Sequence, residues 1–300
     1  MIMDWFYLAL AAPLLYAVVN LFDDNLLQFV YKSPCLATTF SGFFGAVPLV
    51  ALAMRPAHIS GMLAGLALLT GLLTVCYYFF YFKGLESDMP SVVIALFSLA
   101  PATIPVFARI FVHERLTSLQ LLGFILVLLS SLAMATIDIR KLKFSAALAP
   151  VVIAVILMDV ASILSKRLYQ QADFYGVYMG FCAGMGVGGL GFLLLKFRDN
   201  KRGLLEIKKG IRKVLPFFVA AEAVNVAAEF TINLAISNGP VSLVKAIEGI
   251  QPMFVLAMAI ALYSFAPKYF REAEDPQVGR KLFLMFIAVF GLGVIGFATR

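Results

Sequence analysis

Long apolar runs constrain this chain more than any other feature of its sequence. They are continuous, each is about 20 residues long, and short polar connections separate most of them. One globular core cannot bury them all, because 62% of the 300 residues are hydrophobic and only 14% are charged. Soluble domains have about 45–50% apolar and about 25% charged residues. Lipid must cover the surplus, which excludes a soluble enzyme, a nucleic-acid-binding protein and a disordered chain.

Hydropathy predicts ten membrane-spanning helices. Their approximate bounds are Trp5–Val30, Cys35–Met54, Ser60–Phe82, Pro90–Val112, Ser118–Thr136, Ala147–Tyr169, Phe174–Leu195, Leu215–Ser237, Pro240–Phe265 and Leu282–Thr299. A segment inside the bilayer must satisfy its own backbone hydrogen bonds, and a continuous apolar run does so as a helix. We therefore expect an all-α integral membrane protein. Its two longer connections, Lys196–Lys213 and Ala266–Lys281, are expected to be loops.

The basic residues lie between the apolar runs. The net charge of +7 is therefore attributed to the flanks of membrane helices, and no nucleic-acid partner is expected. Ten spans place five Lys and Arg residues on the side of the two termini and seventeen on the other side. By the positive-inside rule the seventeen face the cytoplasm. This predicts a multi-pass protein of the cell (inner) membrane with both termini outside.

The sequence contains no pattern typical of a metal centre or of an enzyme. Cys35, Cys76 and Cys182 lie far apart in apolar stretches, and His58 and His113 lie in predicted loops. Neither metal-ligand spacing nor a phosphate-binding loop nor a nucleophile–base pair is present. We expect no catalytic residues, no metal and no cofactor.

An internal repeat appears when the sequence is shifted by 151 residues. Pro101 then coincides with Pro252, and Tyr78 coincides with Glu229. The register holds without a gap across the third and fourth spans against the eighth and ninth. Since each half contains an odd number of spans, the halves must have opposite orientations. We predict two inverted five-helix repeats, residues 1–139 and 144–300, with a site between them near the midplane, as is typical of transporters.

Several short motifs occur in a consistent order. They are Ala95–Pro101, His113–Thr117 with the sequence His-Glu-Arg-Leu-Thr, Leu121–Gly123, and Ala246–Pro252. In order and spacing they resemble the EamA-type form of the drug/metabolite transporter superfamily. The resemblance implies that spans one, three, four, six, eight and nine line a central cavity. The chain departs from the family pattern at His113, where the family usually has Gly. The termini predicted outside also differ from what the family usually shows.

Charged and amide side chains inside the predicted spans are the main candidates for a site. Placing one charge at the bilayer centre costs at least about 2.5–3.5 kcal/mol. Glu222, Asn225 and Glu229 share one face of the eighth span, being spaced i, i+3 and i+7. Lys245 and Glu248 share a face of the ninth span at a similar depth, and Gln251 extends that polar stripe. The alternative is that Lys245 only pairs with Glu248 or Glu229 and ties helices together.

The first half contributes Asn20, Thr74 and Tyr78 to the predicted cavity. With Asn225, Glu229, Lys245, Glu248 and Gln251 they form the predicted substrate-binding set. The tyrosines of the third span are expected to stack on a substrate or cover a cation; the alternative is an interfacial aromatic belt, which suits Tyr81 better than Tyr78.

Four intramembrane carboxyl groups are candidates for proton coupling: Asp159, Glu222, Glu229 and Glu248. A buried carboxyl group can carry a proton. The alternatives are an inter-helix hydrogen bond for Asp159 and contact with water for Glu222.

Prolines and glycines predict gates and close contacts. Pro101 and Pro252 lie at equivalent places inside spans four and nine, where kinks would serve as gating hinges or as static bends. Glycines recur every fourth residue in the seventh span, at Gly176, Gly180, Gly184 and Gly188, and again at Gly61 and Gly65. Such stripes predict close helix packing.

The function that we predict is secondary active transport of a small amine-bearing or zwitterionic metabolite, such as an amino acid. The predicted cavity contains four carboxyl groups and one lysine, and this excess of negative charge favours a solute with an amine. Transport of this solute coupled to protons is also considered. Export by alternating access rests on analogy with the family. One alternative is a flippase for a lipid-linked sugar or other lipid, and a less favoured one is an intramembrane transferase. The partners expected are the small-molecule or lipid-linked substrate and the bilayer, with a homodimer also considered.

Overall fold

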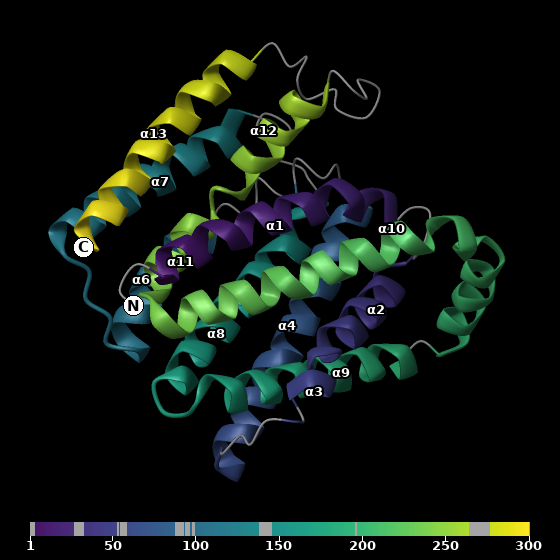
Figure 1. The fold of residues 1–300 in the computed structure, drawn as a ribbon. Helices are drawn as coiled ribbons and strands as arrows, with labels where there is room; N and C mark the ends of the chain where they lie inside the picture. Colours follow the sequence, from purple (N-terminus) through teal and green to yellow (C-terminus); the bar gives the residue numbers. More distant parts are fainter. Residues whose placement is uncertain are drawn as a thin grey trace.

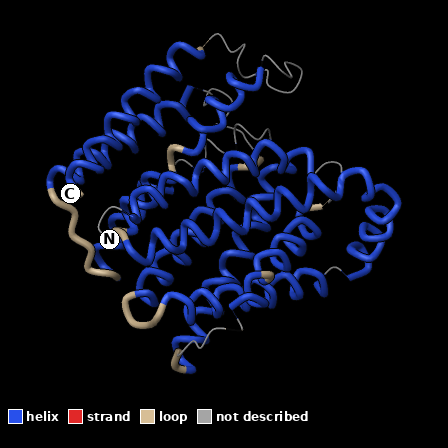
Figure 2. The backbone as a smooth tube through the Cα atoms, in the orientation of Figure 1, coloured by secondary structure: helices blue, strands red, loops and turns tan. Residues whose placement is uncertain are grey.

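The computed structural model describes residues 4–26, 33–52, 54, 59–87, 93, 97, 100–137, 146–195, 197–263 and 277–299. Every regular element in this part of the chain is a helix, as Figure 2 shows. The all-α prediction is therefore confirmed for these residues. Predictions that depend on Lys196 or Ala266–Pro276, and those for much of the fourth span before Ala100, lie outside the residues described.

The helices follow the hydropathy of the sequence (Figure 1). In the first half they are α1 (Asp4–Leu26), α2 (Pro34–Ala46), α3 (Pro48–Leu52), α4 (Gly61–Ser87), α6 (Ala100–Phe111) and α7 (Ser118–Ile137). In the second half they are α8 (Leu148–Tyr169), α9 (Phe174–Leu195), α10 (Phe197–Asn238), α11 (Val241–Glu248), α12 (Gln251–Tyr263) and α13 (Val278–Ala298). The two termini lie at the same end of the molecule (Figure 1).

Seven segments of the described chain are long and apolar enough to cross a membrane. They are Pro34–Leu52, Gly61–Ser87, Leu148–Tyr169, Phe174–Leu195, Phe218–Asn238, Val241–Met258 and Gly279–Ala298. Three shorter apolar helical segments, Trp5–Asn20, Pro101–Phe111 and Ser118–Ala133, coincide with the other predicted spans. The protein is therefore a multi-pass membrane protein.

The predicted loop over residues 196–213 is wrong for the part that is described. Helix α10 runs without interruption from Phe197 to Asn238 and includes the basic stretch. This stretch is rich in Lys, Arg, Leu and Glu, which are good helix formers even where hydropathy is low. Figure 1 shows the beginning of α10 turning away from its apolar part, and Pro216 within the helix removes one backbone donor.

The ninth span, predicted as one helix, is broken. Helix α11 ends at Glu248 and α12 begins at Gln251. Pro252 has no N–H group to donate to the carbonyl group of Glu248, so the helical ladder cannot continue through this point. The polar residues of this span therefore lie at a helix break.

The glycine stripe on α9 brings two backbones into contact. A Cβ atom added at Gly184 would lie 2.0 Å from the carbonyl oxygen of Leu68, and one added at Gly71 would lie 2.0 Å from that of Phe181. The close packing of α9 against α4 is therefore confirmed. The same prediction for Gly61 and Gly65 is wrong, because nothing lies within 4 Å of a Cβ atom placed there.

Other extensive contacts join α4 to α8, α1 to α10, α2 to α9, and α7 to α13. The pair α7 and α13 forms one edge of the molecule (Figure 1). Its outer face exposes large apolar side chains, among them Leu129, Phe283, Phe286 and Phe290. Lipid suits such a surface, while the polar side chains lie inside the bundle.

Candidate functional site

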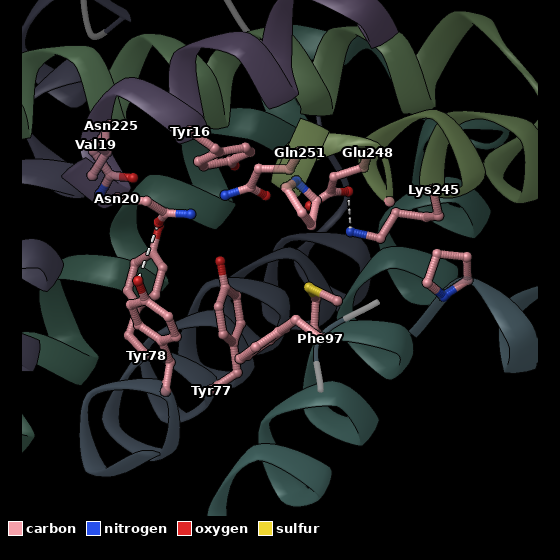
Figure 3. A pocket seen from close by; sticks show the side chains of 15 residues that line it. Tyr16, Val19, Asn20, Tyr77, Tyr78, Phe97, Asn225, Lys245, Glu248 and Gln251 are labelled. Atoms are coloured by element: carbon pink, nitrogen blue, oxygen red, sulfur yellow. Dashed lines mark hydrogen bonds and ion pairs between the residues drawn. The ribbon is translucent and has the colours of Figure 1, made fainter. Parts of the chain in front are cut away.

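The larger of two adjoining cavities among the described helices has a volume of about 770 Å³, including the open space at its mouth. Its walls come from α1, α4, α6, α8, α10, α11 and α12, and Figure 3 shows their side chains converging on it. The lining residues are Tyr16, Val19, Asn20, Tyr77, Tyr78, Tyr81, Phe97, Pro101, Met158, Asn225, Lys245, Glu248, Gly249, Gln251 and Pro252. These helices correspond to the spans that the family resemblance implied.

Most of the predicted substrate-binding residues meet at this cavity. Six of the eight line it: Asn20, Tyr78, Asn225, Lys245, Glu248 and Gln251. The other two, Thr74 and Glu229, line an adjoining smaller cavity of about 380 Å³. Both predicted gating prolines, Pro101 and Pro252, lie in the wall of the larger cavity.

Lys245 and Glu248 form an ion pair on the last turn of α11. Lys245 Nζ donates to Glu248 Oε2 at 2.5 Å, and the two side chains are 5% and 15% exposed. The pairing with Glu248, one of the two alternatives for Lys245, is thus present. Both residues nevertheless line both cavities, so the pair faces open space.

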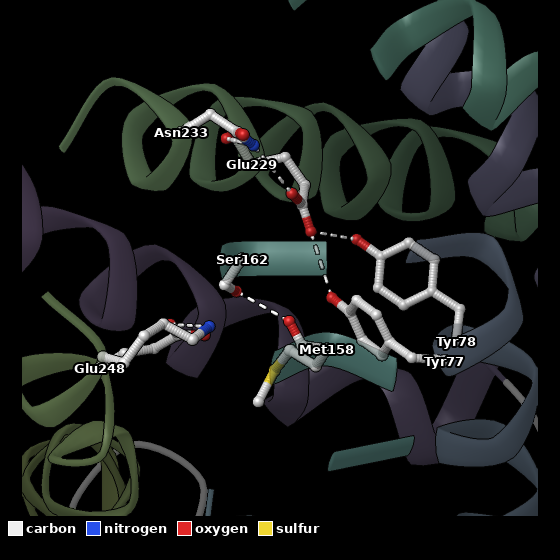
Figure 4. A network of polar contacts seen from close by, with 8 residues as sticks. Tyr77, Tyr78, Met158, Ser162, Glu229, Asn233 and Glu248 are labelled. Atoms are coloured by element: carbon white, nitrogen blue, oxygen red, sulfur yellow. Dashed lines mark hydrogen bonds and ion pairs between the residues drawn. The ribbon is translucent and has the colours of Figure 1, made fainter. Parts of the chain in front are cut away.

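Glu229 is held by hydroxyl and amide groups. The hydroxyl groups of Tyr78 and Tyr77 donate to its Oε1 at 2.6 and 3.2 Å. Asn233 Nδ2 donates to its backbone oxygen at 2.9 Å and approaches Oε2 at 3.5 Å, as seen in Figure 4. Tyr78 and Glu229, which coincide in the 151-residue shift, are therefore direct partners.

Asp159 and Glu222 are buried and line neither of the two cavities that the ion pair faces. Asp159 Oδ2 accepts a hydrogen bond from the hydroxyl group of Thr103 on α6, and its Oδ1 is buried without a hydrogen-bond partner. Glu222 Oε1 accepts from Ser41 Oγ at 3.1 Å and lines a third cavity of about 300 Å³. The four predicted proton-coupling residues thus do not share one cavity.

The sequence interpretation missed several polar residues at the site. Tyr16 lines both cavities, and Ser162, Ser165 and Asn233 line the smaller one. Asn233 lies four residues after Glu229 and continues the polar face of that helix, so helical spacing was a usable signal. Helical spacing did not identify Ser162 and Ser165 in the same way.

Tyr81, for which an interfacial aromatic belt is the alternative, lies at the site. Its hydroxyl group donates to Asn20 Oδ1 at 3.1 Å, and the residue lines the larger cavity. Its hydroxyl is therefore directed at a side chain of the site rather than at a membrane interface.

The turn between α10 and α11 closes the end of the bundle where the termini lie. Lys166 Nζ donates to the carbonyl oxygens of Ile236, Ser237 and Gly239 at 2.9, 3.3 and 2.7 Å. A basic side chain at the C-terminal end of a helix stabilises the last carbonyl groups. A Cβ atom at Gly239 would lie 2.4 Å from the ring of Trp5, so the turn is also packed tightly.

Glu114 holds the same turn from the other side. Its Oε1 accepts a hydrogen bond from the backbone N–H of Ser242, in the first turn of α11, at 3.2 Å. A carboxylate is favourable at a helix N-terminus. Burial nevertheless raises the pKa of the Glu114 carboxyl, against the lowering effect of Ser242 and Lys166.

His113, the departure from the family pattern, has φ of 56°. This lies in the left-handed region, which glycine adopts without steric cost. The backbone therefore accounts for the Gly that the family usually has at this position.

Among the described residues, no group of three or more His, Cys, Asp or Glu side chains is placed to hold a metal ion.

Comparisons with known proteins agree with this architecture. Residues 3–136 match the EamA-like transporter family, which confirms the resemblance over that part of the chain. A solved crystal structure of a protein 18% identical to this chain has a TM-score of 0.69, and the alignment covers 99% of this chain and 97% of the other. This likeness shows a shared fold over nearly the whole length. No curated protein matches the chain in sequence.

Proposed function

Because residues 3–136 match the EamA-like transporter family, we propose that the protein is a secondary active transporter of a small amine-bearing or zwitterionic metabolite. The observation that carries the proposal is the Lys245–Glu248 ion pair, which faces two cavities at the break between α11 and α12. Broken helices near the midplane are typical of solute sites in transporters. The solute moves by alternating access.

The ion pair favours a zwitterion. The ammonium group of an amino acid would bind Glu248 and its carboxylate would bind Lys245, so that each buried charge keeps a partner. A solute with only one charge would leave the other member of the pair uncompensated, which is costly in a buried site. The hydroxyl groups of Tyr16 and Tyr77 and the amide groups of Asn20 and Gln251 supply further hydrogen bonds around the same space.

The packing supports two inverted five-helix repeats, residues 1–139 and 144–300. Under such symmetry α1 corresponds to α8 and α4 to α10, so the contacts of α4 with α8 and of α1 with α10 are equivalent. A residue near a two-fold axis contacts its own counterpart. Tyr78 and Glu229 are such counterparts and are hydrogen-bonded, which is expected if the axis passes between them.

Proton coupling is assigned first to Glu229. Its carboxyl group is buried, lines the smaller cavity and is held by donors that suit a charged or a neutral carboxyl group. Glu248, Asp159 and Glu222 remain further candidates. Pro101 and Pro252 both lie in the cavity wall near helix starts, where they are suited to act as hinges.

The direction proposed is export. The larger cavity includes Asn20, Asn225 and Gln251, which lie farther from the termini than Glu229 along their helices. The end near the termini is closed by Lys166 and Glu114. With the termini outside the cell, the cavity would open to the cytoplasm and receive solute there.

The test is uptake into proteoliposomes of a labelled pool of amino acids and amines at several pH values. Wild type is compared with Lys245→Met, Glu248→Gln and Glu229→Gln. The matched control is Thr231→Val, because that hydroxyl is exposed and bonds only within its own helix, to Ala227. We expect uptake to fall by at least about a hundredfold in the ion-pair variants, since unpairing one buried charge costs about 3–5 kcal/mol and each 1.4 kcal/mol is about tenfold.

Two results would contradict the proposal. Unchanged uptake in correctly folded Lys245→Met and Glu248→Gln would reduce the ion pair to a structural contact. If wild type takes up nothing from the pool, a small zwitterionic solute is wrong, and flipping of a fluorescent lipid in the same vesicles then tests the flippase alternative.

A further inference from the structure

The smaller cavity adjoins the larger one but has its own lining. Five residues line both cavities and form the partition between them: Tyr16, Tyr77, Met158, Lys245 and Glu248. Beyond this partition the smaller cavity is lined by Thr74, Ala161, Ser162, Ser165, Phe181, Glu229, Ile232, Asn233 and Ile236. Figure 4 shows three of these residues, Ser162, Glu229 and Asn233. It is thus a separate polar space, about half the size of the larger cavity.

Its position is toward the termini. Along α10 it extends from Glu229 to Ile236, a distance of about 10 Å, in the direction of the turn after Asn238. There Lys166 bonds the carbonyl oxygens of Ile236 and Gly239 and closes the bundle. These contacts tie α8 to the end of α10 and to the turn that follows it, on the side of the smaller cavity that faces the termini.

Hydrogen-bonding groups continue from Glu229 toward the same end. Asn233 Nδ2 bonds the backbone oxygen of Glu229 and approaches its carboxyl group. Tyr169, the last residue of α8, donates to Asn233 Oδ1 at 2.9 Å. Ser165 and Ser162, whose hydroxyl group donates to the backbone oxygen of Met158 at 2.8 Å, line the same cavity. A buried water needs about two to four polar partners, and this lining supplies them.

We propose that the smaller cavity is the route by which Glu229 exchanges its coupling proton with the membrane side that carries the termini, while solute uses only the larger cavity. The inference rests on the proposed function, since it concerns the coupling ion of that transporter. A proton needs only hydrogen-bonded water and side chains to move, so a path closed to solute can still carry it. The proposal assigns Asn233 and Ser165 to this proton route.

The surroundings of Glu229 are consistent with one exchangeable proton. The titratable and charged groups that interact with it are Tyr16 from α1, Tyr77 and Tyr78 from α4, Tyr169 from α8, Tyr178 and Cys182 from α9, and Lys245 and Glu248 from α11. The only cation among these groups is already paired with Glu248. Changes in the charge of Glu229 are therefore balanced by a proton rather than by that lysine.

The first experiment needs no solute. The infrared carboxyl band that Glu229→Gln removes is identified at acidic pH, and its shift is followed after transfer into D₂O. Asn233→Leu and Ser165→Val should slow this exchange about tenfold. Asn20→Leu makes the same amide-to-apolar change in the larger cavity only, and should leave the exchange rate within about twofold. Ser165→Val is a small change that keeps the test open if Asn233→Leu does not fold.

The second experiment separates the proton from the solute. In proteoliposomes with an internal pH dye, Asn233→Leu and Ser165→Val should lower net proton-driven uptake about tenfold but leave solute–solute exchange near wild type. Asn20→Leu should instead lower solute exchange.

Three outcomes would overturn the inference. They are the absence of any carboxyl band that depends on Glu229, slowing of deuterium exchange by Asn20→Leu but not by Asn233→Leu, and an equal loss of net uptake and exchange in Asn233→Leu. If wild type transports nothing, the proposed function fails, but the infrared experiment still decides the proton route.

Discussion

At the scale of single residues, the loop from His113 to Thr117 shows how local geometry determines which residue a motif position favours. His113 is the only non-glycine residue with positive φ in the described part of the chain, and the next residue bonds the N-terminus of α11. A left-handed backbone costs an L-residue about 1–2 kcal/mol. The backbone conformation therefore determines which residue is favoured at position 113. At position 114 the contact with the N-terminus of α11 determines it.

We expect His113→Gly to raise the free energy of unfolding by about 1 kcal/mol, because glycine has no Cβ atom to clash in this conformation. The measurement is reversible unfolding in detergent. Arg115→Gly, in the same loop at ordinary φ, is the control and should lower stability. Equal effects of the two substitutions would show that the positive φ does not matter.

Glu114 should make stability depend on pH. Its folded pKa is raised from 4.5, so the folded state binds the proton more tightly than the unfolded state does. By linkage this favours folding at low pH, and stability falls as pH rises from 4.5 through the raised pKa. Glu114→Gln keeps an acceptor for Ser242 and should remove this fall. Identical pH profiles of unfolding for the two proteins would contradict the assignment.

At the scale of helices, the contact between α4 and α9 depends on the absence of side chains. Gly71, Gly184 and Gly188 allow backbone and side chains of the two helices to meet at distances that no Cβ atom permits. Small residues at such crossings let van der Waals contact and lipid release stabilise helix pairs in the membrane. Not every glycine does this, as Gly61 and Gly65 show.

Gly184→Ala should destabilise the fold by about 1–3 kcal/mol, because the added atom would lie 2.0 Å from a backbone oxygen of α4 and must push the helices apart. Gly191→Ala on the same helix meets nothing within 4 Å. It should instead be neutral or stabilising by up to about 1 kcal/mol through helix propensity. Thermal unfolding in one detergent compares the two, and similar melting temperatures would refute the close contact.

At the scale of the whole molecule, the site lies between elements far apart in the sequence, and contacts between helices hold the end near the termini. Lys166 on α8 holds carbonyl groups of α10, Glu114 holds α11, and Trp5 of α1 packs on the turn between them. The alternating access that we propose requires this end to open while the opposite end closes.

Lys166→Met should loosen the closed end, since three carbonyl oxygens lose their donor. Trp5 is the only tryptophan of the chain and is 3% exposed, so its emission should shift to longer wavelength as water reaches it. Arg167→Met, next along α8, removes a bond to the carbonyl oxygen of Phe111 only and should leave the emission unchanged. Identical emission spectra for wild type and Lys166→Met would argue against this gate.

Much of the architecture was predictable from local sequence alone. Inside a bilayer each segment must satisfy its own backbone, so apolar length determines where helices lie, and residue spacing determines which polar side chains share a face. The positions of the apolar helices, the turn after Asn238 and six cavity-lining residues followed from this. The basic beginning of α10 did not, because a helix formed by propensity leaves no signal in hydropathy.

The tertiary structure alone decided which groups became partners. The sequence left Lys245 with two possible carboxylates, and packing paired it with Glu248 and gave Glu229 to Tyr77 and Tyr78, about 150 residues away. Packing also created two cavities with a shared partition and placed Tyr81 in one of them. Such pairings depend on how separate helices cross and rotate, which the spacing within one helix does not specify.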